Sequence, residues 1–533
     1  MFETRKATDV SKGDLLGGSE VPHRRNGHDR QMSDRQIGMT GQLPAAGVDK
    51  SLGAGGDELL RQGDAATQSP SRWCGRAEVL VAVVAFAAMC VAVLVRSAQL
   101  LEPDDYAYRA SIIALTHGHL LSLTNAEYQA LLKELSNGGG QGISQWVHTA
   151  SGTWISEKNP GYPFLAAPFQ LMGLLRAAPL FYGALGCLGL FVGARRWLGC
   201  WGGTWAVVLF CSSGAALAFA WRPTMPTFTD ASLIAAGTGA LLWAMLATER
   251  TVRRRLIVGL LAFVSLEAAV LVRYTNVVLL AVAVLATLLV LRRVALPWRT
   301  LRWWLGSVVV LFAGILGFDY LAYGSALKTG YSSGEITFSL SSVIPNLQHL
   351  PAPLVKSMPM VVLSLGALAW IAVLGVVSQR RPGMDGARRR THRRDVVIGS
   401  FLALGWFGIW GLYSAYDWTA RMAGGTGGGI QVIRFYLPAL GLVALLAAWL
   451  LIRLPRWLTI SILVAVIGLG ALSYTNLAAG GIGPGGGIPG VRPGIGGSIP
   501  PGAPGGAPGG IPGGVPGGPP AGVGGPGGAA PNG

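Results

Sequence analysis

Cysteine and charge are both scarce in this chain. Its 533 residues include five cysteines, namely Cys74, Cys90, Cys187, Cys200 and Cys211. These fall in or beside apolar runs and outside the large polar loops, so the sequence contains neither a disulfide framework nor a metal-ligand spacing. Only 13% of the residues are charged and 51% are hydrophobic. This balance excludes an ordinary soluble globule and indicates a chain with many membrane segments.

The hydrophobic residues gather in long runs that contain few charges. A bilayer core of roughly 30 Å requires about 20 apolar residues for each crossing helix. By this measure about eleven membrane helices are predicted, at residues 77–95, 177–194, 202–221, 228–247, 256–272, 276–291, 303–322, 357–377, 396–415, 435–452 and 457–474. The run 164–173 is too short to cross, so we expect an interfacial or re-entrant helix there. The predicted fold is an all-α polytopic transmembrane helix bundle.

The position of the basic residues predicts an orientation. The formal net charge is +17, and the excess lies in short Arg clusters between apolar runs, at residues 195–196, 253–255, 292–293, 380–381 and 388–394. Such clusters are typical of the cytoplasmic ends of membrane helices, which makes binding to nucleic acid the weaker interpretation. An N-terminus on the inside brings every cluster to the cytoplasmic side. The loops 98–160, 323–356 and 416–434 then lie outside a cytoplasmic membrane.

Both ends of the chain differ in composition from the middle. Residues 1–73 are polar and lack apolar periodicity, which predicts a disordered cytoplasmic tail and no cleavable signal peptide. Residues 477–533 are rich in Gly and Pro without a glycine at every third position, which predicts a flexible tail and excludes collagen. This tail lies outside if the helix count is odd. The transmembrane domain is expected at residues 74–476.

An acidic pair follows the first apolar run. Residues 102–106 read Glu-Pro-Asp-Asp-Tyr, so Asp104 and Asp105 lie just past a membrane helix. Ionisable groups at such a depth are costly unless they are hydrated, paired or used, and they indicate a functional site. The simpler alternative is a helix start, because Pro and Asp both favour the first turn. The rest of the loop 98–160 has the periodicity of amphipathic helices that lie along the membrane surface.

Several motifs, in this order and on this side of the membrane, resemble those of the GT-C membrane glycosyltransferases, especially the protein O-mannosyltransferases and the lipid A aminoarabinose transferase. They are the acidic pair with Tyr106, Lys-Asn-Pro-Gly-Tyr-Pro at 158–163, Arg-Arg-Trp-Leu-Gly at 195–199, the loop 323–331 and Arg-Phe-Tyr-Leu-Pro at 434–438. Neither tail belongs to the family pattern. A soluble C-terminal domain of the oligosaccharyltransferase kind is not found in the sequence.

The resemblance implies an enzyme that passes a sugar, a hexose or a pentose, from a polyprenyl-phosphate donor to an acceptor outside the membrane. Asp104 or Asp105 is expected to act as the general base or to orient the acceptor hydroxyl. The residues expected to bind substrate are Tyr106, Lys158, Tyr162, Arg273 and Arg434, and the other outside cations are Arg222, Lys328 and Arg421. A divalent cation such as Mg²⁺ or Mn²⁺ held by Asp105 is an open alternative.

Other interpretations stay open at this point. Arg434 and Arg222 at helix ends can equally be anchors in the headgroup region. Asp230 is expected to pair with Arg222, and Glu267 is a candidate partner of Arg273. A lipid or solute transporter is the alternative function, although internal repeats are not evident. The sequence does not identify the sugar or whether the acceptor is a glycan, a lipid or a protein.

Overall fold

The computed structural model describes residues 72–97, 103–119, 122–136, 145–149, 152–246, 252–291, 298–331, 336–380, 386–423 and 429–480. The two predicted tails therefore lie almost entirely outside the described residues.

Long apolar helices make up most of the described chain. Eight are long and apolar enough to cross a membrane: α2 (Arg72–Leu94), α6 (Ala177–Leu198), α9 (Thr227–Leu246), α10 (Val252–Val272), α12 (Trp298–Tyr323), α15 (Met360–Arg380), α16 (Gly386–Ser414) and α20 (Arg456–Gly480). The predicted all-α polytopic membrane bundle is thus confirmed.

The other predicted runs are helical but shorter or broken. Helices α7 (Cys200–Cys211) and α8 (Gly214–Ala220) form a pair bent by 63° where one helix was expected. Helix α11 (Val277–Leu291) follows the 3₁₀ turn η1 (Tyr274–Asn276), and α19 (Leu440–Leu451) follows η3 (Leu437–Ala439). By length and composition, eight or nine segments of the described chain can cross, so the exact number of crossings stays a prediction.

Close packing of small residues joins α6 to α9. A Cβ added at Gly193 would lie 2.3 Å from the carbonyl oxygen of Gly239, and one at Gly239 would lie 2.1 Å from the carbonyl oxygen of Gly189. Only glycine fits at such distances, and small residues spaced by four allow membrane helices to approach closely. This is the most extensive contact between two helices of the described chain, and it holds α9, the helix that follows the Arg222 segment discussed below.

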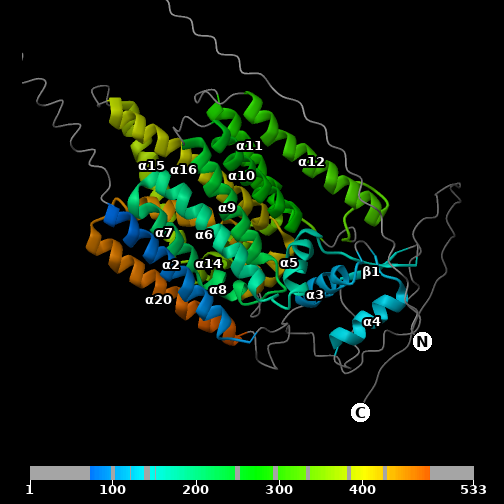
Figure 1. The fold of residues 1–533 in the computed structure, drawn as a ribbon. Helices are drawn as coiled ribbons and strands as arrows, with labels where there is room; N and C mark the ends of the chain where they lie inside the picture. Colours follow the sequence, from blue (N-terminus) through cyan, green and yellow to red (C-terminus); the bar gives the residue numbers. More distant parts are fainter. Residues whose placement is uncertain are drawn as a thin grey trace, which may run out of the picture. The chain divides into compact units, whose positions relative to one another are not determined.

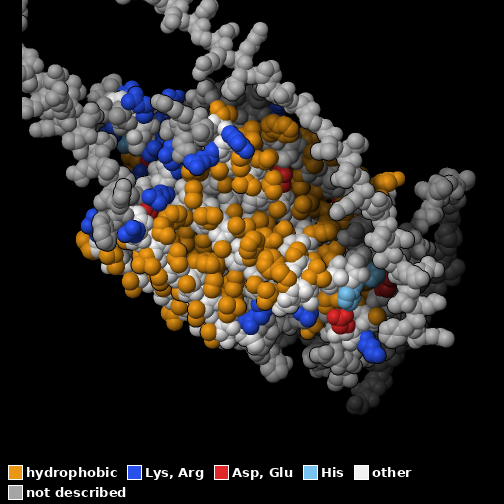
Figure 2. Space-filling model, viewed as in Figure 1, with side chains coloured by type: hydrophobic (Ala, Val, Ile, Leu, Met, Phe, Trp, Pro, Cys, Tyr) orange, Lys and Arg blue, Asp and Glu red, His pale blue; other side chains and the backbone are white. Residues whose placement is uncertain are grey.

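Helix α19 lies inside the bundle, whereas α2 and α20 face outward. Almost every side chain of α19 is buried, and the helix packs on α7, α9, α15 and α16. A helix surrounded by protein need not match the bilayer thickness, which accounts for its 12 residues. The hydroxyl of Tyr474 on α20 donates to the carbonyl of Ala92 on α2. Figure 2 shows hydrophobic side chains covering the middle of one face and most of the visible Lys and Arg gathered along one edge.

The loop after α2 folds into a small unit at one end of the long helices (Figure 1). It contains α3 (Pro103–Thr116), α4 (Asn125–Ser136), the antiparallel strands β1 (Trp146–His148) and β2 (Trp154–Ser156), and then α5 (Gly161–Leu171). The two helices were expected, and the strands were not. The hairpin is held by side chains, because the rings of Tyr128 and Trp154 stack with their centroids 4.0 Å apart.

Reciprocal side-chain bonds begin α4. The backbone nitrogen of Thr124 donates to Glu127 at 2.7 Å, and the backbone nitrogen of Glu127 donates to Thr124 Oγ1 at 3.3 Å. This is a capping box, which supplies acceptors to the unsatisfied amides of a helix start. Other short helices connect the later spans: η2 (Leu340–Ser342), α13 (Val343–His349), α14 (Pro351–Ser357), α17 (Asp417–Ala423) and α18 (Gly429–Ile433).

Candidate active site

The first turn of α3 turns its two carboxylates in different directions, because successive helical residues are about 100° apart. Asp105 points into the bundle and is fully buried. Its Oδ2 forms an ion pair with the guanidinium of Arg222, and its Oδ1 accepts a hydrogen bond from Thr224 Oγ1 at 2.8 Å. Both partners lie in the segment between α8 and α9. Asp105 therefore fastens α3 to the membrane bundle.

Tyr162 fastens α5 to the same segment. Its side chain is completely buried, and its hydroxyl donates to the carbonyl of Pro223. Its ring also packs edge-on against Tyr108 of α3, with centroids 5.9 Å apart. The predicted substrate contact of Tyr162 stays a prediction, and the contacts seen here are with the protein itself.

Asp104 lies on the other side of the turn, between two cations. Its Oδ1 is 3.0 Å from Lys158 Nζ, and its Oδ2 forms an ion pair with Arg434 Nη1. The side chain of Asp104 remains 14% exposed, and that of Arg434 remains 12% exposed. Arg434 lies 330 positions later in the chain, between α18 and η3. Folding thus brings together three residues that the sequence had indicated separately.

The charges of this triad support one another. Burial alone would raise the pKa of Asp104, but Arg434 and Lys158 outweigh burial and hold this pKa well below its ordinary range. For Lys158, burial lowers the pKa, whereas Asp104 and Tyr331 raise it, and the net direction is upward. Asp104 is therefore ionised and Lys158 is protonated across the neutral range.

Aromatic side chains surround the two cations. The guanidinium carbon of Arg434 lies 5.2 Å from the ring centroid of Trp418 and 4.8 Å from that of Phe435. The ammonium of Lys158 donates to the hydroxyl of Tyr331 at 3.3 Å. Cations over aromatic faces are attracted to the ring quadrupole, so the rings restrain both cations without neutralising them. Trp418 was not singled out in the sequence, because nothing local there distinguishes a site residue from a membrane-interface aromatic.

A second ion pair lies directly behind Arg434. Arg273 Nη1 donates to the backbone carbonyl of Arg434 at 3.2 Å, and Arg273 Nε lies 3.5 Å from Asp230 Oδ2. Asn276 Nδ2 donates to the other oxygen of Asp230. Arg273, predicted to bind substrate, thus supports the backbone of a second predicted residue.

Two expected pairings are wrong. Asp230 pairs with Arg273, because Arg222 is already engaged by Asp105 across the segment that connects α8 to α9. Glu267 does not pair with Arg273 and instead accepts a hydrogen bond from Ser307 Oγ of α12 at 2.7 Å. Both expectations assumed that residues close in sequence would pair. Charges inside a membrane protein instead pair with the neighbours that helix packing brings close.

The remaining predicted residues lie at the edge of this region. Tyr106 is 40% exposed, on a different face of α3 from Asp105, and its role in binding stays a prediction. Lys328 and Arg421 are exposed. The pKa of Asp417 is lowered mainly by hydrogen bonds from Ser342 and Thr337, and the nearby charge of Arg421 lowers it slightly further.

The residues around Asp105 do not fit a metal ion. One of its oxygens faces Arg222 and the other faces Thr224, while neighbouring Asp104 faces two cations. Within the described ranges, no group of three or more His, Cys, Asp or Glu side chains is placed to hold a metal. A divalent cation would be repelled by these arginines.

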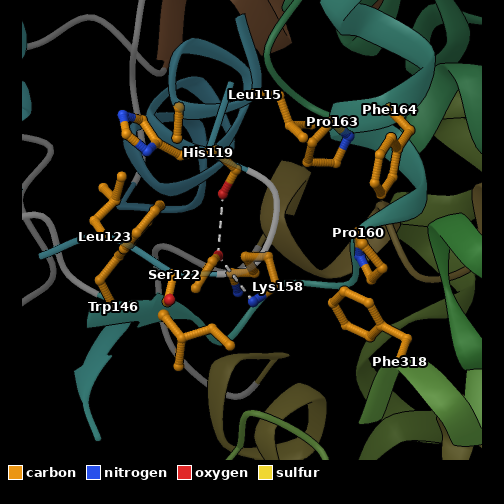
Figure 3. A pocket seen from close by; sticks show the side chains of 14 residues that line it. Leu115, His119, Ser122, Leu123, Trp146, Lys158, Pro160, Pro163, Phe164 and Phe318 are labelled. Carbon is orange, nitrogen blue, oxygen red and sulfur yellow. Dashed lines mark hydrogen bonds between the residues drawn. The ribbon is translucent and has the colours of Figure 1, made fainter. Parts of the chain in front are cut away.

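A pocket opens beside Lys158 (Figure 3). Its lining includes the apolar side chains of Leu115, Phe164 and Phe318, of which the last comes from α12. Ser156 also lines the pocket, and its hydroxyl accepts from the backbone nitrogen of Lys158 at 3.2 Å. Lys158 belongs both to this pocket and to the triad, so a molecule in the pocket would lie next to one of the two cations that face Asp104.

No family model and no curated protein matches this chain. Among solved structures, it is similar to ArnT from Cupriavidus metallidurans bound to undecaprenyl phosphate, with 16% identity, a TM-score of 0.44 and coverage of 77% of this chain and 72% of that chain. It is also similar to the Archaeoglobus fulgidus oligosaccharyltransferase in the apo form, with 11% identity, a TM-score of 0.43 and coverage of 77% and 56%. A second structure from that archaeon, AglB with an inhibitory peptide and a dolichol-phosphate, has 12% identity, a TM-score of 0.41 and coverage of 76% and 56%.

Proposed function

We propose that this protein is a membrane glycosyltransferase that moves a sugar from a polyprenyl-phosphate donor to an acceptor at the outer face of the cytoplasmic membrane. The observation that carries the proposal is the triad, in which a carboxylate lies between an arginine and a lysine at the end of a membrane bundle. A lipid-borne phosphate needs cations at the depth of its headgroup, and an acceptor hydroxyl needs a carboxylate beside them.

Arg434 and Lys158 are assigned to the phosphate. Arginine presents a planar fork that can bind two phosphate oxygens, and lysine supplies a compact point charge. Arg273 holds the backbone carbonyl of Arg434 and so sets the direction of the fork. A phosphate held in this way is a better leaving group, because its developing negative charge is stabilised by groups already in place.

The two aspartates are given different roles. Asp104 lies partly exposed next to the cations, where it can accept a hydrogen bond from an acceptor hydroxyl. Asp105 is completely buried and engaged by Arg222 and Thr224, so its role is to hold α3 in place. The sequence resemblance left the choice between the two carboxylates open, and the difference in burial supports the assignment of the reacting role to Asp104.

The orientation rests on the distribution of arginines along the helices. Arg253 and Arg254 begin α10, whereas Arg273 and the triad lie at its far end. Likewise, α16 begins with a run of arginines and ends at Ser414, and the ring of Tyr413 near this end packs against Phe435, next to Arg434. If the arginine-rich ends are cytoplasmic, the triad faces outward. The sugar, a hexose or pentose, and the acceptor, a glycan, a lipid or a protein, are left to experiment.

The test is sugar transfer by the full chain in proteoliposomes that contain a set of radiolabelled polyprenyl-phosphate sugars. The proposal expects one donor to be consumed by the wild type and not by Arg434→Gln. Profiling of lipid-linked sugars in cells with and without the protein identifies the same donor by its accumulation. If no donor accumulates and none is consumed, the transferase assignment fails and a transporter becomes the better explanation.

A further inference from the structure

In this structure, Asp104 engages both cations to which the proposed function assigns the phosphate. Lys158 contacts one oxygen of Asp104 and Arg434 contacts the other. The carboxylate is therefore paired with the ammonium of Lys158 and the guanidinium of Arg434 at the same time. Two cations facing one carboxylate leave a net positive charge that attracts an anion. A donor phosphate that arrives must therefore share these cations with Asp104 or displace it.

We infer that Asp104 occupies the place of the donor phosphate until the donor binds, and that the arriving phosphate draws Arg434 and Lys158 away and so converts Asp104 into the general base. The inference rests on the proposed function and adds an order of events to it. Before binding, Asp104 is a poor base, because its two cationic partners favour the ionised form. After binding, the phosphate supplies those cations with another anion.

Charge balance supports this exchange. A sugar phosphodiester carries one negative charge, so with Asp104 it neutralises the two cations. In the transfer step, the acceptor oxygen forms a bond to the anomeric carbon, and the bond from that carbon to the phosphate oxygen breaks. The electron pair of the broken bond stays on the phosphate, and the acceptor proton moves to Asp104. The departing phosphomonoester then carries about two negative charges, so protonation of Asp104 keeps the site neutral.

Among the residues that the structure describes, no other ionisable neighbour of the triad is suited to take this proton. Tyr331 contacts Lys158, and Tyr108, Tyr416 and Arg273 lie near enough to interact with the triad. Burial raises the pKa of Tyr108 well above its ordinary value and raises that of Tyr416 to about 12. Tyr108 and Tyr416 therefore stay protonated at neutral pH, and Arg273 is a cation. Asp104 is thus the carboxylate next to both cations in the described part of the site.

The test separates phosphate binding from turnover. Binding of undecaprenyl phosphate to the full chain in detergent is measured by calorimetry for wild type, Asp104→Asn and Arg434→Gln. Removal of the competing carboxylate is expected to tighten binding by roughly tenfold, because the phosphate no longer displaces an ion-pair partner. The same Asp104→Asn variant is expected to lose roughly 100-fold or more in transfer rate. Arg434→Gln should weaken binding of the lipid phosphate and also lower the transfer rate.

The outcomes are distinguishable. If Asp104→Asn binds the lipid phosphate no more tightly than wild type, the exchange is wrong even though the transferase proposal stands. If the wild type itself does not bind the phosphate, the proposed function fails first. Should Asp104→Asn fold poorly, Asp104→Ala and thermal stabilisation by the ligand provide the second measurement. The inference expects the ligand to raise the melting temperature of either variant more than that of wild type, and an equal or smaller rise overturns it.

Discussion

The arginine-rich end of α16 and the triad both pair aspartates with arginines, but the aspartate side chains differ in their exposure to solvent. At the arginine-rich end of α16, Asp395 is 1% exposed and is engaged by Trp197 Nε1 at 2.9 Å and Arg453 Nη2 at 2.6 Å. Asp105 is buried in the same way. Asp104, its immediate neighbour, keeps partial exposure with its cations. Buried pairs join helices, whereas a partly exposed triad next to a pocket is available to a ligand.

The difference has an energetic origin. A buried charge with fully satisfied partners is expensive to separate, because its removal leaves another charge uncompensated. Such a pair suits a fixed joint between elements. A pair at the edge of solvent can exchange partners at lower cost, because water and ligands can replace the lost contacts. Position therefore distinguishes the two adjacent aspartates although they belong to the same helical turn.

The largest expected effect is on the stability of the protein and follows from loss of the buried ion pair between Asp105 and Arg222. Asp105→Asn should lower the free energy of unfolding by about 3–5 kcal/mol, because Arg222 would be left buried without its carboxylate. Thermal unfolding in detergent measures this, with Asp395→Asn as the matched variant in the other region. If Asp105→Asn is as stable as wild type, the conclusion that Asp105 differs from Asp104 by holding α3 to the bundle is wrong.

Loss of the phosphate fork should affect turnover more than stability. Arg434→Gln is expected to reduce sugar transfer by roughly 100- to 1,000-fold, because the leaving phosphate loses its stabilising donors. Arg434→Lys should restore only part of this, since a point charge cannot reproduce a bidentate contact. Steady-state transfer in proteoliposomes, with melting temperature as the control, gives the answer. Normal transfer by the Gln variant would remove Arg434 from the site.

The support behind the fork should have a smaller effect. Arg273→Gln is expected to lower kcat/KM by roughly tenfold, because the backbone carbonyl of Arg434 loses a charged donor. Glu267→Gln on α10, the helix that ends just before Arg273, is the matched control, because Glu267 bonds Ser307 of α12 and lies outside the triad. Equal losses in the two variants would mean that Arg273 acts only through general stability.

The smallest effect concerns pH. The pKa of Asp104 is lowered by folding, so its contribution to stability is present above the ordinary carboxyl value and is lost as pH falls below it. The pKa of Lys158 is raised, so its contribution is complete below the ordinary lysine value and is lost as pH rises above it. The difference in melting temperature between wild type and Asp104→Asn should therefore be constant from about pH 5 to about pH 9. A slope within that window would show that another group titrates.

Prediction from the sequence succeeded where a local pattern carries the information. Runs of apolar residues predicted the helices. The motifs also singled out Asp104, Lys158 and Arg434, which the structure brings together, while their roles stay predictions. The strands β1 and β2 were missed, because each has three residues and both depend on packing against Tyr128. The pairings of Asp230 and Glu267 were wrong, because sequence distance does not report which helices are neighbours.

The sequence by itself determined that this chain folds as membrane helices, because long uncharged runs satisfy their backbone polar groups in lipid only as helices. It also determined which ionisable residues lie next to those helices. Only the tertiary structure decided that Asp104 meets Lys158 and Arg434 while Asp105 meets Arg222. The physical reason is that a turn of about 100° per residue sends adjacent side chains toward different neighbours, and helix packing selects what those neighbours are.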